Sequence, residues 1–399
     1  MCSRPPTSPK PLVPRHMKVL LLSKALVVGA YQRKAEELAA LPGVELTVAV
    51  PPSWREPGAV EQRLERRFMR GYRLAVLPIW LNGRHHVHFY PAIERLVAAV
   101  RPDVFHVDEE SFNLATFLAM RAGRRYGARC CFYNWANIDR RYPPPFSLFE
   151  RYSFRHAAHA IAGNQEAADI IRGHGYGGPI AILPQFGVDP DLFSLNDQRP
   201  TTNDQTQEPA PSSFALHRSS FVVGYLGRLL PQKGVLDLVG ALPLLPDYVT
   251  LRLIGDGTLR PQILARAAEL GVAARVELVA WTDDVPRELR RLNALALPSR
   301  TTRAWKEQFG RVLPEAMSCG VPVIGSSSGE IPNVIGDAGL IFAEGDVGAL
   351  AAAIRRLAEE PALRADLSRR GRARVLERYT QAALARQYYE VYQLMVERH

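Results

Sequence analysis

Cysteine is scarce in this sequence of 399 residues and long apolar runs are lacking, and each absence excludes a class of protein. The four cysteines, Cys2, Cys130, Cys131 and Cys319, have the spacing of neither a disulfide framework nor a zinc site. We therefore expect a reducing, cytoplasmic location. No stretch approaches the roughly 20 apolar residues that cross a bilayer. Residues 1–16 contain prolines and basic residues but no apolar core of a secretory signal, and we interpret them as a disordered leader.

Acidic residues are outnumbered by basic ones. The sequence has 50 Lys and Arg against 40 Asp and Glu, a formal net charge of +10. Such an excess favours an anionic partner, which could be a nucleic acid, an acidic membrane face or a phosphorylated substrate. Because the positive charge is scattered and no nucleic-acid module is recognisable, we expect no nucleic-acid partner.

Short apolar segments alternate with amphipathic ones in both halves of the chain, which predicts parallel α/β sheets. In the first half, the predicted strands are 18–22, 44–50, 104–107, 128–133 and 159–162, and helices are predicted over 31–41 and 113–124. In the second half, the predicted strands are 221–226, 249–254, 276–279, 294–297, 321–324 and 340–342. Two such sheets predict two Rossmann-like domains, whose ligands bind at the carboxyl ends of the strands.

The two halves are separated by residues 194–220, a polar and proline-containing stretch that predicts a linker or a solvated loop. We therefore place the domains at residues 17–193 and 221–380. The last segment, 381–399, has apolar side chains at helical spacing, which predicts a docking helix with one buried face. These side chains are Leu384, Tyr388, Val391, Tyr392 and Met395.

The segment YLGRLLPQKG, residues 225–234, has the features of a phosphate site. It follows a predicted strand, bends at Gly227 and leads into a helix near Gly234. The N-terminus of a helix favours anions, and Arg228 and Lys233 add two positive charges. A strand, a glycine and two cations also occur together by chance, so this segment alone leaves the function open.

The segment WKEQFGRVLPEAMSCGVPVIG, residues 305–325, carries two glutamates. Glu307 is predicted in a loop, and Glu315 about one turn into a helix that begins near Arg311. Both carboxylates suit the vicinal hydroxyls of a ribose or a hexose. The alternative is that both are solvated surface residues.

Here the sequence resembles a known family. EQFGRVLPEAMSCGVPV resembles the Glu-x-Phe-Gly…Glu-Ala-Met motif of the retaining family 4 glycosyltransferases, which have the GT-B fold. GRLLPQKG at 227–234, LIGDG at 253–257, PSR at 298–300 and SGEIPNVIGDAGLIF at 328–342 agree in order and spacing. The first half agrees more loosely, through the Gly29 loop, PDVFHVDEE at 102–110 and PQFGVDPDLF at 184–193.

The resemblance implies which residues bind the donor, a nucleoside-diphosphate sugar. Arg228 and Lys233 would hold the diphosphate after the turn at Gly227 and offset the charge on the departing nucleotide. Gly29 would let the N-terminal loop approach the phosphates closely.

The resemblance also implies contacts to the two sugars of the donor. Glu307, with the backbone of Phe309 and Gly310, would contact the transferred sugar. Glu315 would accept hydrogen bonds from the ribose hydroxyls. Asn333 stands where relatives have a glutamate, and Glu330 could compensate for it.

On the acceptor side the sequence departs from the family. Relatives often carry His-x-His after an N-terminal strand, whereas here His106 is followed by Asp108, Glu109 and Glu110. We predict that one of Asp108, Glu109 or Glu110 orients the acceptor hydroxyl or assists its deprotonation, with Asp108 and Glu109 as the main candidates; the others are ordinary loop carboxylates. Asn134 and Trp135, after another strand, suit a sugar-binding lip, although Trp135 could equally belong to the core.

Three further patterns leave alternatives open. Asp283-Asp284 fits either a metal pair or the cap and dipole partner of a helix. The histidines at 85, 86 and 88 fit either a metal site or an ordinary strand or loop edge. Residues 55–73, with arginines at 63, 66, 67 and 70, predict a basic helix that either lies on a membrane surface or presents a solvated face.

Together these observations predict a GT-B α/β enzyme with an acceptor domain (17–193), a nucleotide-sugar domain (221–380) and a C-terminal helix (381–399) that packs back on the first domain. It would be a retaining, metal-independent glycosyltransferase without a cofactor, using a UDP-, GDP- or ADP-sugar and a glycan or lipid-linked acceptor in bacterial cell-surface synthesis. We expect it in the cytoplasm or at the inner face of the membrane. The alternatives are a nucleotide-sugar epimerase or hydrolase on the same fold and a non-catalytic basic binding protein.

Overall fold

The computed structural model describes residues 16–56, 60–195 and 220–397. The chain divides into two compact units, the first made of residues 1–133, 143–160 and 385–399, and the second of residues 134–142 and 161–384. The predicted leader, apart from residue 16, and most of the predicted linker at 194–220 lie outside the described residues.

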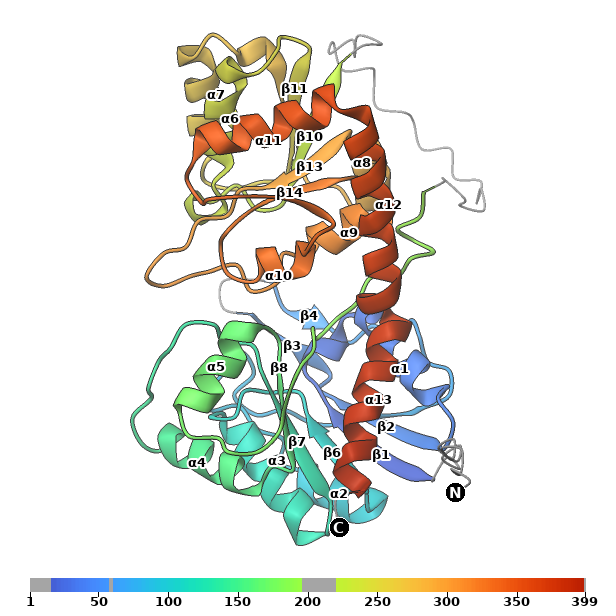
Figure 1. Cartoon of the computed structure of the whole chain (residues 1–399). Coiled ribbons are helices and arrows are strands. Elements are labelled where there is room, and N and C mark those ends of the chain that lie inside the picture. Colours follow the sequence, from blue (N-terminus) through green and yellow to red (C-terminus); the bar gives the residue numbers. More distant parts are fainter. Residues whose placement is uncertain (1–15, 57–59, 196–219, 398–399) are drawn as a thin grey trace, which may run out of the picture. The chain divides into compact units, whose positions relative to one another are not determined.

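Within the described residues, one sheet has seven strands in the order β5-β2-β1-β6-β7-β8-β9 (Figure 1). Its strands are β1 Met17–Leu22, β2 Val44–Val50, β5 Arg73–Val76, β6 Val104–Val107, β7 Arg129–Asn134, β8 His159–Ala162 and β9 Ile180–Ile182. The pairs of β1 with β2 and β6, of β2 with β5 and of β6 with β7 are parallel. The central strands are buried along nearly their whole length, which explains why their sequences are continuous apolar runs.

The elements that accompany this sheet are short helices and one small hairpin. The hairpin pairs β3 Ser53–Trp54 with β4 Gln62–Arg63. The helices are η1 Ala25–Val27, η2 Gly29–Gln32, α1 Arg33–Ala39, α2 Ile93–Val100, α3 Leu114–Arg125, α4 Phe146–His156 and α5 Gln165–Gly173.

The predicted basic helix over residues 55–73 is wrong. Its described residues contain β4 and irregular backbone before β5 begins. The reason is a set of hydrogen bonds from a distant side chain. The Gln32 amide donates to the Glu65 carbonyl at 2.7 Å and accepts from the Arg67 N–H at 3.1 Å. These bonds take the backbone groups that an α-helix would pair internally.

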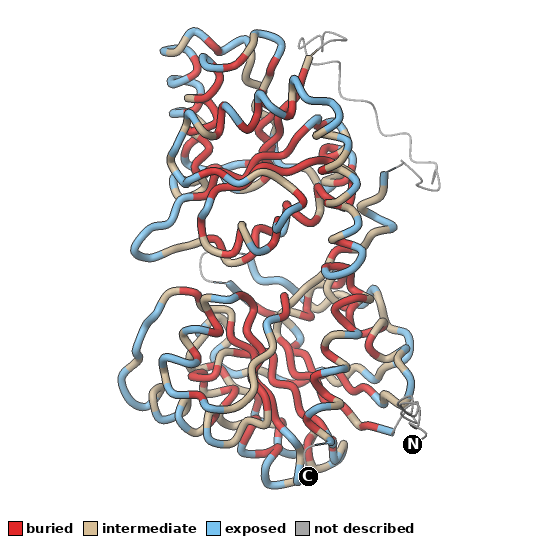
Figure 2. Tube along the Cα trace, in the orientation of Figure 1, coloured by how far each residue is buried: buried red, intermediate tan, exposed pale blue. Residues whose placement is uncertain are grey.

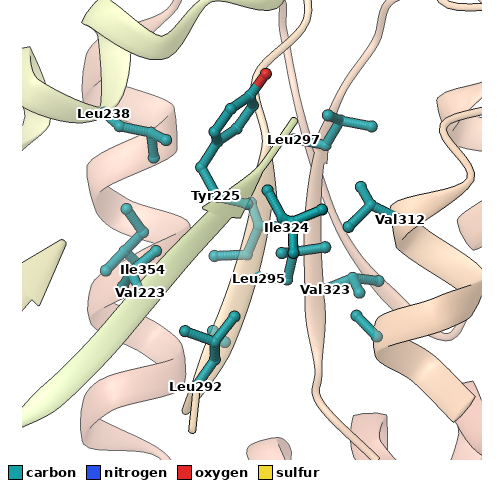
Figure 3. Packing of buried hydrophobic residues seen from close by; sticks show 14 of the residues in the cluster. Val223, Tyr225, Leu238, Leu292, Leu295, Leu297, Val312, Val323, Ile324 and Ile354 are labelled. Atoms are coloured by element: carbon teal, nitrogen blue, oxygen red, sulfur yellow. The ribbon is translucent and has the colours of Figure 1, made fainter. Parts of the chain in front are cut away.

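A second sheet has six strands among the described residues, in the order β12-β11-β10-β13-β14-β15. All five neighbouring pairs are parallel. The strands are β10 Phe221–Leu226, β11 Val249–Ile254, β12 Val276–Val279, β13 Ala294–Leu297, β14 Val323–Ser326 and β15 Gly339–Phe342. Figure 3 shows the core: Val223 and Tyr225 of β10, Leu295 and Leu297 of β13, and Ile324 of β14 lie among Leu238, Val312 and Ile354 from the helices.

In the second unit, α6 packs against α7 and α11, α9 packs against α8, α10 and α12, and α11 also contacts α12. Their bounds are η3 Pro231–Lys233, α6 Val235–Ala241, η4 Leu242–Leu244, α7 Arg260–Glu269, η5 Ala273–Arg275, α8 Val285–Arg290, α9 Val312–Ser318, α10 Ile331–Ile335, α11 Val347–Glu359 and α12 Pro361–Arg378. Burial is concentrated in the strands and the facing sides of the helices (Figure 2). Asp284 caps α8 by accepting from the Arg287 N–H at 3.2 Å, which confirms the capping interpretation of Asp283-Asp284.

The last helix, α13 Gln381–Glu397, has most of its length in the first unit. The five side chains predicted to form its apolar face are all buried. Within the first unit, the Tyr392 hydroxyl lies 2.7 Å from His106 Nδ1, and Tyr388 stacks on the His106 ring with 5.5 Å between centroids.

In the part of the chain that the structure describes, no helix combines the length and the apolar character needed to cross a membrane.

Candidate active site

The predicted phosphate loop follows β10 and is fixed against the next loop by backbone contacts. Gly227 has φ +153° and donates its N–H to the Ile254 carbonyl at 3.0 Å. A Cβ on Gly255 would lie 2.0 Å from the Gly227 carbonyl oxygen, so the two loops approach closely only because that residue is glycine. This packing leaves Arg228 exposed, and Arg228 has no ion-pair partner within the described residues.

Lys233 and Glu307, which are 74 residues apart in the sequence, form an ion pair. Lys233 ends η3, and its Nζ lies 2.7 Å from Glu307 Oε2. The Ser299 hydroxyl donates to the same carboxylate oxygen at 2.8 Å. Lys233 Nζ also lies 4.6 Å from the centroid of the Trp305 ring. The side chains of Lys233 and Glu307 are only 16% and 9% exposed, so water screens their attraction weakly.

The backbone of Glu307 is held by the loop before α10. Its carbonyl oxygen accepts the Glu330 N–H at 3.0 Å. A Cβ on Gly329, which has φ +53°, would lie 2.0 Å from that oxygen, so this contact requires glycine. The Glu330 carboxylate in turn accepts from the Gln165 N–H at 3.1 Å and the Asn333 amide at 3.2 Å. Glu330 and Asn333 therefore act together in shaping the loop that positions Glu307.

Of the predicted site residues after Glu307, Phe309 has a side chain that belongs to the hydrophobic core, whereas Gly310 and Glu315 lie at the start of α9. Phe309 is buried and packs edge-on against Tyr379, with 5.6 Å between ring centroids, so only its backbone is available to a ligand. Gly310 has φ +72°, and its carbonyl accepts the Leu313 N–H at 2.8 Å as α9 begins. Glu315 lies in the first turn of α9, where burial raises the pKa of its carboxyl to about 7.

The predicted sugar-binding lip is placed in the second unit. Asn134 ends β7 and is buried. Trp135 is partly buried against the core of the second unit. Its carbonyl accepts the side-chain amides of Asn164 at 3.3 Å and Gln308 at 3.2 Å. This position favours the core alternative for the Trp135 ring, and a role in sugar binding stays a prediction.

In the first unit, the Gly29 N–H already has an anionic partner. It donates to Glu65 Oε2 at 2.9 Å. The other Glu65 oxygen accepts the Gln62 amide at 2.9 Å, and the Glu65 N–H donates to the Val27 carbonyl at 2.9 Å. A carboxylate from a segment 36 residues away thus occupies the backbone donor that we predict for a donor phosphate.

Asp108 and Glu109 follow β6, at the carboxyl end of the sheet, and both are buried. The Ser23 hydroxyl donates to Asp108 at 2.6 Å. Glu109 pairs with Lys24, and its other oxygen lies 3.3 Å from His88 Nε2. Burial would raise the pKa of Glu109, but the charges of Lys24 and His88 outweigh it and lower the pKa to about 2. Such an acid is a weak proton acceptor at neutral pH.

The three histidines at 85, 86 and 88 contact different partners. His85 lies 3.0 Å from Glu56, His86 lies 3.2 Å from the Asn113 amide oxygen, and His88 faces Glu109. In residues 16–56, 60–195 and 220–397, no three His, Cys, Asp or Glu side chains are grouped so as to hold a metal ion.

Sequence reasoning missed four neighbours of the candidate site residues. Ser299 and Trp305 contact the Lys233–Glu307 pair, Lys24 pairs with Glu109, and Glu65 contacts Gly29. Ser299 lies within the PSR motif and Trp305 lies two residues before Glu307. Their place in these motifs is the one feature of the sequence that could have identified them. Glu65 and Lys24 have no signal, because their contacts depend on chain folding over 36 and 85 residues.

Two parallel α/β sheets with polar residues at their carboxyl ends define a two-domain, Rossmann-like ligand-binding fold. Residues 220–360 match the family model described as glycosyl transferases group 1, and residues 28–185 match that of the glycosyl transferase 4-like domain. The chain belongs to the group 1 (family 4) glycosyltransferases, and its fold is GT-B.

Curated relatives match parts of the chain. The N-acetyl-alpha-D-glucosaminyl L-malate synthase of Bacillus anthracis is 31% identical over 183 residues, which cover 45% of this chain and 47% of that protein. The GDP-mannose-dependent alpha-(1-6)-phosphatidylinositol monomannoside mannosyltransferase of Mycolicibacterium smegmatis is 31% identical over 220 residues, covering 51% and 54%. The chain thus spans about half the length of these curated relatives.

Among solved structures, HepE of Anabaena in complex with UDP and glucose is similar over 95% of this chain and 100% of its own, with a TM-score of 0.63 and 19% identity. At that identity the likeness shows the shared fold alone.

Proposed function

We propose that this protein is a retaining glycosyltransferase that moves a sugar from a nucleoside-diphosphate sugar to a glycan or lipid-linked acceptor in bacterial polysaccharide or glycolipid synthesis. The observation that carries the proposal is the shielded Lys233–Glu307 pair beside the phosphate loop of β10. A relative supports it, since the name of the Mycolicibacterium smegmatis protein describes GDP-mannose-dependent mannosyl transfer to a phosphatidylinositol monomannoside.

On the donor side, we assign the diphosphate to Arg228 and Lys233. Cleavage of the bond to the transferred sugar places negative charge on the departing diphosphate, and fixed positive groups lower the energy of that state. Lys233 has three N–H donors and gives one to Glu307, so two stay available to phosphate oxygens. Exposed Arg228 adds a planar group that contacts phosphate in a bidentate manner.

The sugar itself would be held between Glu307 and the backbone of Phe309 and Gly310, with the ribose hydroxyls on Glu315. We propose that the acceptor hydroxyl attacks on the face of the donor phosphate, whose oxygen helps to take its proton, without a covalent enzyme intermediate. Two cationic side chains at the diphosphate support a reaction that needs neither a metal nor a cofactor. Because the pKa of Glu109 is low, we assign Glu109 to positioning Lys24 and His88.

We place the enzyme in the cytoplasm, at the inner face of the membrane. Three of its cysteines, Cys130, Cys131 and Cys319, are free and buried, and burial raises the pKa of each thiol. The arginines at 63, 66, 67 and 70 are exposed and offer positive charge to anionic lipids. Cosedimentation with vesicles of phosphatidylglycerol, against vesicles of phosphatidylcholine, tests this placement.

A thermal-shift screen of the full chain against UDP, GDP, ADP and their sugars, with and without Mg²⁺, tests the proposal. A ligand that binds only the folded state raises the apparent stability. We expect one diphosphate to raise the melting temperature without metal, and the same nucleotide sugar to be consumed only when an acceptor is added.

Two outcomes would count against transfer. Steady consumption of the nucleotide sugar without any acceptor would indicate a hydrolase or an epimerase. The absence of a shift with every nucleotide would indicate a protein that does not bind this donor class.

A further inference from the structure

A recess lies beside the candidate donor site, within the second unit. It has a volume of about 210 Å³ and is lined by residues 136–142 on one side and 304–308 on the other. The side chains that define its chemistry are Asn137, Arg140, Tyr142, Trp305, Lys306 and Gln308. Two aromatic rings and two cations thus border one small cavity.

The walls of this cavity are tied together by hydrogen bonds. The Asn137 amide donates to the Glu307 carbonyl at 3.4 Å, and the Gln308 amide donates to the Trp135 carbonyl at 3.2 Å. The Trp305 carbonyl accepts the Thr302 N–H at 2.8 Å, which closes the turn that carries the ring. The cavity is therefore formed by loops that are anchored at both sides.

The cavity adjoins the residues that we assign to the transferred sugar. Trp305 lines it and lies 4.6 Å from Lys233 Nζ, while Lys233 pairs with Glu307. A molecule bound there would lie next to the reacting end of the donor, which is where an acceptor must be.

The lining indicates the chemical class of that acceptor. Aromatic faces such as those of Trp305 and Tyr142 pack well against the apolar face of a sugar ring. The charge of Lys306 is offset by Glu166, whose Oε1 lies 2.6 Å from its Nζ. Arg140 has no ion-pair partner in the described part of the chain, so the cavity keeps one uncompensated positive charge. A guanidinium binds phosphate or carboxylate in bidentate fashion.

We propose that this cavity is an acceptor subsite for a single sugar-sized ring that carries an anionic group, either a phosphate or a carboxylate. Arg140 binds the anionic group and Trp305 packs against the ring. The inference rests on the proposed function, because it places the acceptor of that reaction.

The test uses the full chain saturated with the nucleoside diphosphate that gives the largest thermal shift. Dissociation constants of glucose, glucose 6-phosphate and glucuronic acid are measured by ligand-observed NMR for the wild type, Arg140→Ala and Arg141→Ala. Arg141 is the matched control, since it is the exposed neighbouring arginine and does not line the cavity.

For the wild type we expect glucose 6-phosphate or glucuronic acid to bind at least about tenfold more tightly than glucose, because a charge-assisted hydrogen bond contributes about that factor. Arg140→Ala should remove this preference, with less than a twofold change for glucose, and Arg141→Ala should keep it. Preference for one of the two anions identifies phosphate or carboxylate as the group that is bound.

Equal affinity of all three probes for the wild type, or the same preference in Arg140→Ala as in the wild type, would overturn the subsite. That result is distinct from failure of the proposed function. If the proposed function fails, no nucleoside diphosphate shifts the melting temperature of the wild type.

Discussion

The two units differ in what surrounds their candidate functional residues. In the second unit, Lys233 and Glu307 meet in a single pair in the loops that follow β10 and β13, and Arg228 in the first of these loops is exposed and without an ion-pair partner in the described residues. In the first unit, the carboxylates of Asp108 and Glu109 are buried and already bonded to Ser23, Lys24 and His88. Arg228 is open to a ligand, whereas the two carboxylates of the first unit are satisfied within the protein.

This difference separates binding charges from structural charges. A buried charge is tolerated only when partners replace the water that it loses, so a fully partnered carboxylate stabilises the fold and has little capacity left for a substrate. An exposed cation beside a short helix keeps its capacity for an anion. We therefore expect substitutions in the second unit to change donor binding and turnover, and substitutions in the first unit to change stability.

The largest effect is expected for Lys233→Ala. It removes a positive charge from the assigned diphosphate site and should lower kcat/KM about a thousandfold, as the loss of a charge-stabilising group in a shielded site does. Steady-state kinetics and donor-induced thermal shifts measure both consequences. Arg266→Ala is the control, because Arg266 lies on α7 and pairs with Glu269 at the surface. Near-normal turnover in Lys233→Ala would contradict the assignment of Lys233 to the donor diphosphate.

Lys24→Ala tests the opposite half of the comparison. It leaves the Glu109 carboxylate buried beside the His88 ring without the lysine that offsets its charge, and removal of one member of a buried pair costs about 3 kcal/mol. We expect urea unfolding to show this loss of stability. The double variant Lys24→Ala, Glu109→Gln should recover part of it, since no charge is then left unpaired. An unchanged midpoint in the single variant would mean that this pair is not structural.

Glu315→Gln tests whether a buried carboxyl of the second unit makes the stability of the protein depend on pH. The Glu315 carboxyl has a pKa of about 7 in the folded protein, because burial disfavours its charge, against 4.5 in an unfolded chain. Between these values the folded protein holds a proton that the unfolded chain releases. Stability from this group therefore falls as the pH rises from 4.5 to 7, by about 3 kcal/mol. Glu315→Gln should lose less stability over that window, measured by urea unfolding at pH 5 and pH 8.

The sequence predicted those elements of the fold that depend on neighbouring residues, and it failed for elements that depend on distant contacts. The strands β1 and β10 are buried apolar runs, and both were predicted to within a residue. The strand β5 was missed, because Arg73–Val76 is short, lies at the sheet edge and is exposed at both ends. The helix predicted over 55–73 failed because a side chain outside the segment, Gln32, binds its backbone.

The same distinction holds for the site. Motif spacing placed Lys233 and Glu307 in one site, but it could not predict that they form an ion pair, nor that Ser299 donates to the same oxygen. Those contacts depend on how loops from η3, β13 and the segment before α9 converge in space. The Gly29–Glu65 contact joins residues 36 apart in the sequence, and no local pattern indicates it.

In the contact between Gly29 and Glu65, a carboxylate of the first unit occupies the backbone N–H that we predict for a donor phosphate. If the Gly29 N–H binds a donor phosphate, Glu65 must leave it first, and its carboxylate repels the incoming anion. Glu65→Gln removes the charge and weakens the competing hydrogen bond. We expect the donor to bind about fivefold more tightly, which corresponds to the net contribution of one hydrogen bond, about 1 kcal/mol.

Isothermal titration of the nucleoside diphosphate into wild type, Glu65→Gln and Glu61→Gln separates this local effect from a general change in charge. Glu61 lies four residues earlier and bonds Ser53 and Arg55 instead of Gly29, so its variant alters the net charge equally without freeing the Gly29 N–H. Equal gains in both variants would mean that only long-range charge matters. A gain confined to Glu65→Gln would show that the first unit also contributes a ligand-binding group, the Gly29 N–H, which the Glu65 carboxylate occupies in the absence of the donor.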